Sequence, residues 1–162
     1  MTKIAVRPAR ADDLQSVCDL ADQINAQHHD ALPETFAAPD SHGRDREFWL
    51  RQITRSDVLF LVAHQQNAVR GFITATIQDG SEIPFLQSSR ICRIGTIVVD
   101  ARFRGGRIGA VLMEHAERWA LTRGASEIRL EVMAFNTEAK AFYERLQYGF
   151  HSHILRKPIE PQ

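Results

Sequence analysis

The chain has 162 residues, 44% of them apolar, and its 20 basic and 20 acidic side chains cancel to a net charge of zero. This length and apolar content fit a single globular domain over residues 1–162 and exclude a disordered chain. The balanced charge argues against a partner that is a nucleic acid or an anionic membrane surface.

The predicted elements follow one another as strand, helix, helix, three strands, helix, strand, helix and strand. Apolar residues recur at helical spacing from Leu14 to Ile24 and from Ile108 to Ala120, whereas they alternate with charged residues over 127–132. In chain order we expect a strand at 4–6, a helix from 12 that fades after 24, a helix over 43–55, strands at 58–63, 71–77 and 91–99, a helix from 108 that ends at Gly124, a strand at 128–132, a helix over 137–146 and a strand at 150–155.

This order of elements predicts the fold class. Three consecutive strands favour antiparallel pairing, and the strand–helix–strand unit over 91–132 implies a parallel crossover. We therefore expect an α/β protein with a mixed, mostly antiparallel sheet and helices on both of its faces.

The segment 98–110 joins the longest predicted strand to the most amphipathic predicted helix. Glycine lets a backbone approach a ligand closely, and the first amides of a helix have no partner within it, so this turn predicts an anion site that suits a diphosphate. The residues that give the turn this character are Arg102, Arg104, Gly105, Gly106, Arg107 and Gly109. The alternative is a tight turn whose arginines are merely solvated.

Two other phosphate motifs do not match this turn. A nucleotide-binding Walker loop needs Gly-Lys-Ser/Thr, which the chain lacks, and Gly105–Gly109 does not fit the dinucleotide pattern Gly-x-Gly-x-x-Gly. A domain that binds ATP through this turn is therefore a weaker hypothesis than one that binds another diphosphate.

The turn resembles the acetyl-CoA loop of the GNAT acetyltransferase superfamily, whose pattern is Arg/Gln-x-x-Gly-x-Gly/Ala. Arg104, Ile108 and Gly109 match this pattern, but Arg107 stands where the family usually has glycine. Gly106 precedes Arg107, so the loop stays rich in glycine, and an outward side chain at 107 would contact phosphate.

A second block supports the same resemblance. The run Asn136-x-x-Ala139-x-x-Phe142-Tyr143-Glu144 is similar to a late helical stretch of the family. The family continues with Gly-Phe or Gly-Tyr, whereas here the text reads Leu-Gln-Tyr-Gly-Phe over 146–150. Either Gln147 replaces the glycine, or two residues are inserted.

The resemblance implies an N-acetyltransferase that transfers an acetyl group from acetyl-CoA to a primary amine in a ternary complex. It also implies a bulged, splayed central strand whose main chain at Ile97 and Val99 pairs with the pantetheine arm and polarises the thioester. Tyr143 would act as the catalytic acid toward the leaving thiolate. The residues implied to contact acetyl-CoA are Ile97, Val98, Val99, Arg104, Gly105, Gly106, Arg107, Ile108, Gly109, Ala110, Asn136, Ala139 and Tyr143.

The general base and the amine acceptor are less well marked. The predicted central strand 90–97 has no carboxylate, and a His-rich, Pro-containing stretch over 28–36 resembles the acceptor loop of some family members. Histidine titrates near neutral pH and suits proton removal. The candidate bases are His28, His29, Asp30, Glu34 and Glu82, and the candidate acceptor-site residues are His28, His29, Glu34 and Phe36. Solvated loop residues are the plain alternative, since a water-relayed proton needs no dedicated base.

Several predictions concern what the chain lacks. His151 and His153 would share a strand face but have no third ligand nearby, so no metal is expected, and Cys18 and Cys92 read as buried free thiols. The sequence shows no signal peptide or membrane span, which predicts a soluble, cytoplasmic protein. Family members often dimerise, so a homodimer is an expectation. The leading alternative function is a CoA-binding regulatory module without turnover.

Overall fold

The computed structural model describes residues 3–40 and 42–159 of the chain. The chain divides into two compact units, one up to Glu131 and one from Val132 onward. The single domain over 1–162 remains a prediction.

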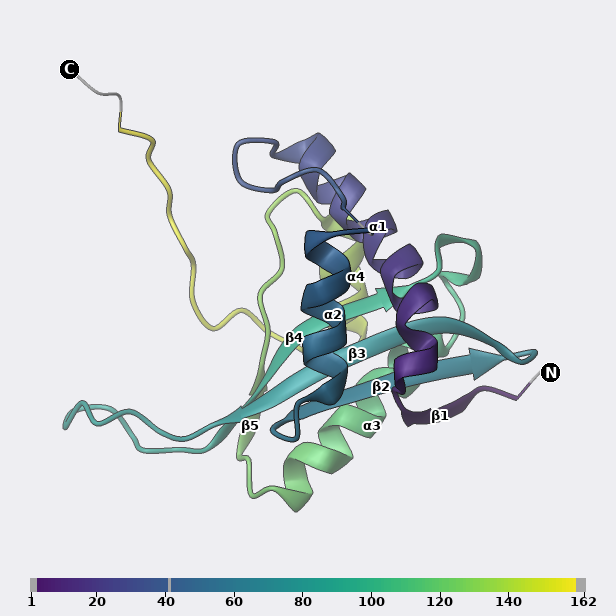
Figure 1. Cartoon of the computed structure of the whole chain (residues 1–162). Coiled ribbons are helices and arrows are strands. Elements are labelled where there is room, and N and C mark those ends of the chain that lie inside the picture. Colours follow the sequence, from purple (N-terminus) through teal and green to yellow (C-terminus); the bar gives the residue numbers. More distant parts are fainter. Residues whose placement is uncertain (1–2, 41, 160–162) are drawn as a thin grey trace. The chain divides into compact units, whose positions relative to one another are not determined.

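The first unit contains one five-stranded sheet with the strand order β1-β2-β3-β4-β5 (Figure 1). The first four strands pair antiparallel and β5 pairs parallel to β4, as the order of elements predicted. Its elements are β1 Ala5–Pro8, the short 3-10 helix η1 Ala11–Asp13, α1 Leu14–Ala31, α2 Arg44–Thr54, β2 Val58–Gln65, β3 Ala68–Gln78, β4 Ile91–Val99, η2 Ala101–Phe103, α3 Ile108–Thr122 and β5 Glu127–Arg129.

Helices cover both faces of this sheet (Figure 1). On one face, α1 and α2 bury an apolar cluster in which the Trp49 ring meets those of Phe60 and Phe72 at centroid distances of 6.1 and 5.1 Å. On the other face, Gly71 of β3 lies so close to α3 that an added Cβ would be 3.2 Å from Ile108. Alternate strand residues thus supply two separate cores, which confirms the predicted layers.

The helix α1 extends further than its apolar stripe predicted. Its buried residues end at Ala21, yet the helix continues through His28 and His29 to Ala31. It stops at Leu32, the residue before Pro33, where the proline ring disfavours helical backbone. The expectation that the helix fades after residue 24 is therefore wrong, because helix length here follows the first breaker rather than the apolar pattern.

The second unit contains α4, Thr137–Arg145. The side chain of Asn136 caps its start by accepting a hydrogen bond of 3.0 Å from the Ala139 amide. At its end, Gln147 has a φ of 67°, its amide donates to Glu144 O at 2.9 Å, and the Tyr148 amide donates to Tyr143 O at 3.0 Å. This pair of bonds is the Schellman ending in which glycine usually occupies the left-handed position. Gln147 therefore takes the place of the glycine, which answers the question that the sequence left open.

The predicted last strand at 150–155 is wrong. The residues from Phe150 to Ile159 have no regular secondary structure, and Ile154 and Leu155 are exposed. A segment becomes a strand only when a neighbouring strand offers hydrogen-bonding groups, and no such pairing involves this segment among the described residues.

Three further predictions concern a membrane span, a metal site and the thiols. Within the described ranges, no helix has the length and apolarity to cross a membrane. Over the same residues, no group of three or more His, Cys, Asp or Glu side chains is placed to hold a metal ion. Cys18 and Cys92 are buried free thiols, as predicted, and burial raises the pKa of Cys92 to about 11.

Candidate functional site

The parallel strands β4 and β5 pair over only a short stretch and then part. The paired residues of β4 end at Arg93, opposite Arg129 of β5. An ion pair of 2.8 Å between Arg93 and Glu131 lies where the pairing stops. In the part of the chain that the structure describes, no strand pairs with β4 on this side beyond Arg93, so the edge over 94–99 is open.

The main chain of β4 presents hydrogen-bonding groups to this open edge. The Asp100 amide donates to Arg70 O of β3 at 2.8 Å, so residue 100 points toward β3. Successive residues of a strand point their N–H and C=O groups to opposite sides, which turns Val98 toward β3 and Ile97 and Val99 toward the open edge. The hydrogen bond from Arg104 Nε to Val99 O, 3.2 Å long, agrees with this direction.

A β-bulge changes the direction of β4 over residues 94–99. Thr74 of β3 pairs with Thr96 and Ala75 pairs with Ile94, so Gly95 is the extra residue. The buried Thr74 hydroxyl accepts a hydrogen bond of 3.0 Å from the Thr96 amide, and an added Cβ on Gly95 would lie 3.0 Å from that hydroxyl oxygen. A bulge increases local twist. The bulge therefore directs the second half of β4 away from β5.

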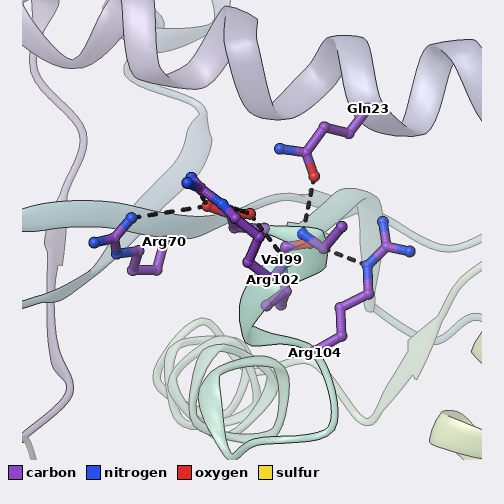
Figure 2. A network of polar contacts seen from close by, with 7 residues as sticks. Gln23, Arg70, Val99, Arg102 and Arg104 are labelled. Atoms are coloured by element: carbon purple, nitrogen blue, oxygen red, sulfur yellow. Dashed lines mark hydrogen bonds and ion pairs between the residues drawn. The ribbon is translucent and has the colours of Figure 1, made fainter.

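The turn after β4 is held at its base by Asp100, whose exposed fraction is only 3%. Figure 2 shows the polar network of this turn, with Arg70, Arg102 and Arg104 labelled in it. Its carboxylate accepts from the Arg102 amide at 3.1 Å and from Arg102 Nη2 at 2.7 Å, and Arg70 Nη1 lies 3.8 Å away. Hydrogen bonds from Arg102 hold the pKa of Asp100 below its ordinary value. The Arg70 guanidinium also stacks on the Phe103 ring, 4.2 Å from its centroid.

Beyond this base the turn exposes its backbone. Gly105, Gly106 and Arg107 are exposed, and Gly105 has a φ of 76° with nothing within 4 Å of an added Cβ. The first main-chain bond of α3 that reaches back to the turn runs from the Val111 amide to Arg107 O at 2.9 Å. The amides of residues 108–110 precede that bond, where a helix has no internal acceptor, and the helix dipole adds positive potential there.

The three arginines of the turn are not equivalent. Arg102 is bound to Asp100, and Arg104 bonds Val99 O through its Nε, whereas the Arg107 side chain stands at the exposed start of α3. The expectation that all three add positive charge to one place therefore needs correction at Arg102, because that cation neutralises a buried acid.

The candidate acceptor-site residues gather at the end of α1 and in the segment after it. The His28 ring stacks on Phe36 at a centroid distance of 4.7 Å, and His29 Nδ1 lies 2.7 Å from Phe36 O. Burial lowers the pKa of His28, so its ring is neutral at neutral pH. Asp30, Glu34 and Glu82 are exposed.

The remaining candidates, Asn136, Ala139 and Tyr143, lie on the second unit. Asn136 and Ala139 share the capping bond of α4, and the Tyr143 ring packs against Phe142 and Tyr148 at centroid distances of 5.1 and 5.9 Å. Burial raises the pKa of Tyr143 to about 12, so the phenol keeps its proton throughout the neutral range.

Sequence reasoning missed the residues that shape this site without facing a ligand. Thr74, Gly95, Asp100 and Gln23 fall in this group, and Gln23 of α1 accepts a hydrogen bond of 2.9 Å from the Ala101 amide. A lone glycine inside the predicted strand was the one available signal, because such a residue often marks a bulge. The partners of Gln23 and Thr74 are remote in sequence and leave no local pattern.

Comparison with known proteins identifies a family model that matches this sequence. The sequence model described as the acetyltransferase (GNAT) family matches residues 24–150. No curated protein sequence matches the chain.

Solved structures share this fold at low sequence identity. A mutant of the BH1408 protein from Bacillus halodurans has a TM-score of 0.90 at 21% identity, over 96% of this chain and 99% of that one. The aminoglycoside N-acetyltransferase AAC(6')-Iy, in complex with CoA, has a TM-score of 0.74 at 17% identity, over 99% and 97%. An aminoglycoside acetyltransferase from an uncultured soil metagenomic sample, in complex with sisomicin, has a TM-score of 0.67 at 16% identity, over 98% and 97%.

Proposed function

The chain belongs to the GNAT acetyltransferase family, and we propose that it is an acetyl-CoA-dependent N-acetyltransferase that acts on a primary amine. The observation that supports this most is the open edge of β4 beside the start of α3. One end of that edge meets exposed glycine amides, and its length offers the main chain of Ile97 and Val99. Such an arrangement suits an extended ligand with an anionic end and an amide-bearing arm, which is the chemistry of CoA.

In this proposal the diphosphate binds the amides of residues 105–110, with Arg107 and Arg104 adding charge. The pantetheine arm lies along Ile97, Val98 and Val99, where its amides pair with β4 as an added strand would. The resemblance to the family assigns contacts with the same arm to Asn136 and Ala139.

The transfer step needs a neutral amine, a stabilised oxyanion and a leaving thiolate. The amine nitrogen attacks the thioester carbonyl, the C–N bond forms, and the C–S bond breaks as the tetrahedral intermediate collapses. The main-chain amide of Val99 faces the open edge and would donate to the oxyanion. Tyr143, protonated because burial raises its pKa to about 12, would donate to the departing sulfur.

The amine must lose a proton, and in this proposal His28 takes it directly or through water. Its lowered pKa keeps the ring neutral near pH 7, and the Phe36 ring fixes its orientation by stacking. The acceptor would bind near His28, His29, Glu34 and Phe36.

A turnover screen tests the activity. Purified protein with acetyl-CoA and a panel of amines, including sisomicin and a lysine peptide, should release free CoA thiol with at least one acceptor. Aminoglycosides belong in the panel because two structurally similar proteins are aminoglycoside acetyltransferases. Tight CoA binding with no thiol release from any amine would favour the regulatory module.

A charge-reversal variant tests the binding site separately. Arg107→Glu places a carboxylate beside the diphosphate and should weaken CoA binding measured by calorimetry. Arg51→Glu makes the same change on an exposed residue of α2 and should leave binding unchanged. Equal affinities for both variants would remove the turn from the CoA site.

A further inference from the structure

A hydrogen bond between Gln23 and Ala101 links α1 to the turn after β4. Gln23 Oε1 accepts from the Ala101 amide at 2.9 Å, across 78 positions of sequence (Figure 2). Gln23 also lines a polar groove of about 440 Å³ together with Arg70, Asp100 and Arg102. The link therefore belongs to the same network that holds the base of the turn.

The other main-chain amides at this base donate to acceptors on the neighbouring strand β3 or within the turn itself. The Asp100 amide donates to Arg70 O at 2.8 Å, the Arg102 amide to Asp100 Oδ1 at 3.1 Å and the Phe103 amide to Asp100 O at 2.8 Å. In this run only the Ala101 amide relies on a helix from another part of the unit. Loss of the Gln23 acceptor would leave that amide without its partner at the point where the strand becomes the turn.

Gln23 also marks a change along α1. Up to Ala21 the helix is anchored by buried side chains, and beyond Ile24, which packs on the core in part, it has no buried residue. His28 follows Gln23 by five residues, about 7.5 Å along the helix axis. The Gln23 link therefore ties the turn to the helical segment that carries His28 and His29.

We propose that Gln23 is a positioning residue that couples the CoA-binding turn to the acceptor-side end of α1. It preorganises the turn for the diphosphate, and occupancy of the turn in return steadies residues 24–31. This inference rests on the proposed function, since it takes CoA as the ligand of the turn. A turn that is already in its bound shape loses less conformational freedom on binding, which favours affinity.

Two variants of the whole chain test the coupling. Gln23→Met keeps the length of the side chain and removes the acceptor, and Gln15→Met makes the same change two turns earlier on α1, where the side chain bonds Asp19 and Arg46 instead. Gln23→Met should weaken CoA binding by about fivefold, the effect of one lost hydrogen bond. Gln15→Met should bind CoA as the parent does.

Amide hydrogen exchange separates coupling from a merely structural role of Gln23, because a structural role would not change which residues CoA protects. In the parent and in Gln15→Met, CoA should slow exchange in residues 24–31 as well as in the turn, whereas in Gln23→Met it should slow exchange in the turn alone. Protection of 24–31 by CoA in Gln23→Met, or its absence in the parent, would overturn the coupling. The parent experiment stands even if Gln23→Met fails to fold. If the parent does not bind CoA at all, the proposed function itself is wrong.

Discussion

Replacing Asp100 with asparagine tests how the turn after β4 is held. Asp100 is 3% exposed, and its carboxylate accepts three hydrogen bonds from Arg102, of 3.1, 3.1 and 2.7 Å. In addition, Arg70 Nη1 lies 3.8 Å from the same carboxylate. Asparagine keeps the size and one acceptor oxygen, but its NH₂ group must face at least one guanidinium donor.

The expected cost follows from these contacts. A hydrogen bond to a charged partner contributes about 1.5–3 kcal/mol, and the exposure of the Arg102 side chain favours the lower part of that range. We expect Asp100→Asn to lower the free energy of unfolding by about 2 kcal/mol at pH 7. With a urea slope of about 2 kcal/mol/M, the unfolding midpoint would fall by about 1 M.

The difference in stability between the parent and Asp100→Asn should depend on pH. The pKa of Asp100 is lowered in the folded protein, so its stabilisation is present above the unfolded pKa of about 3.9 and is lost as the pH falls through the folded pKa. The difference in stability between parent and Asp100→Asn should therefore be full at pH 7 and shrink below about pH 4. Asp57→Asn removes an exposed partner of Arg55 and should leave the urea midpoint unchanged. A difference that stays constant with pH, or matches that of the control, would refute the argument.

Three further substitutions test the fold and the chemistry. Gln147→Gly should stabilise the chain by about 1 kcal/mol, a rise in Tm of about 3 °C, because glycine adopts a φ of 67° without strain; a Tm equal to that of the parent would contradict this. Gly71→Ala should destabilise it by about 1–3 kcal/mol in urea, because its Cβ would lie 2.7 Å from Val98 O, while Gly149→Ala, which meets nothing within 4 Å, should be neutral. Tyr143→Phe should lower kcat about a hundredfold and change KM little, and an unchanged kcat would remove Tyr143 from the mechanism.

The elements with strong local signals were predictable from the sequence. The bounds of β4 match the prediction of 91–99, and α3 begins at Ile108, where the apolar spacing changes from strand to helix. Gly124 ends α3 with a φ of 75°, as a glycine cap should. In each case the deciding interactions lie within one element or at its ends, so a short window of sequence contains them.

The features that depend on remote partners were not predictable. The length of α1 follows from Pro33 rather than from its apolar stripe, and the segment from Phe150 to Ile159 has no strand partner among the residues that the structure describes. The resemblance implied a bulge in the central strand, which the register of β4 confirms, but its exact place at Gly95 depends on the hydroxyl of Thr74 on another strand. The roles of the candidate site residues stay predictions for the same reason, because a role depends on where ligand atoms lie.

Under the proposed function, a buried acid lies beneath a turn that would bind a diphosphate, and its negative charge by itself would repel the ligand. Asp100 does not do so, because Arg70 and Arg102 surround its carboxylate and leave it 3% exposed. Its charge is used to fix the first residues of the turn, while Arg104 and Arg107 keep the potential near the start of α3 positive. Replacing the acid by a neutral residue would therefore add positive charge and still weaken CoA binding, since the turn would lose its shape. Tighter CoA binding by Asp100→Asn than by the parent would show that net charge outweighs preorganisation at this site.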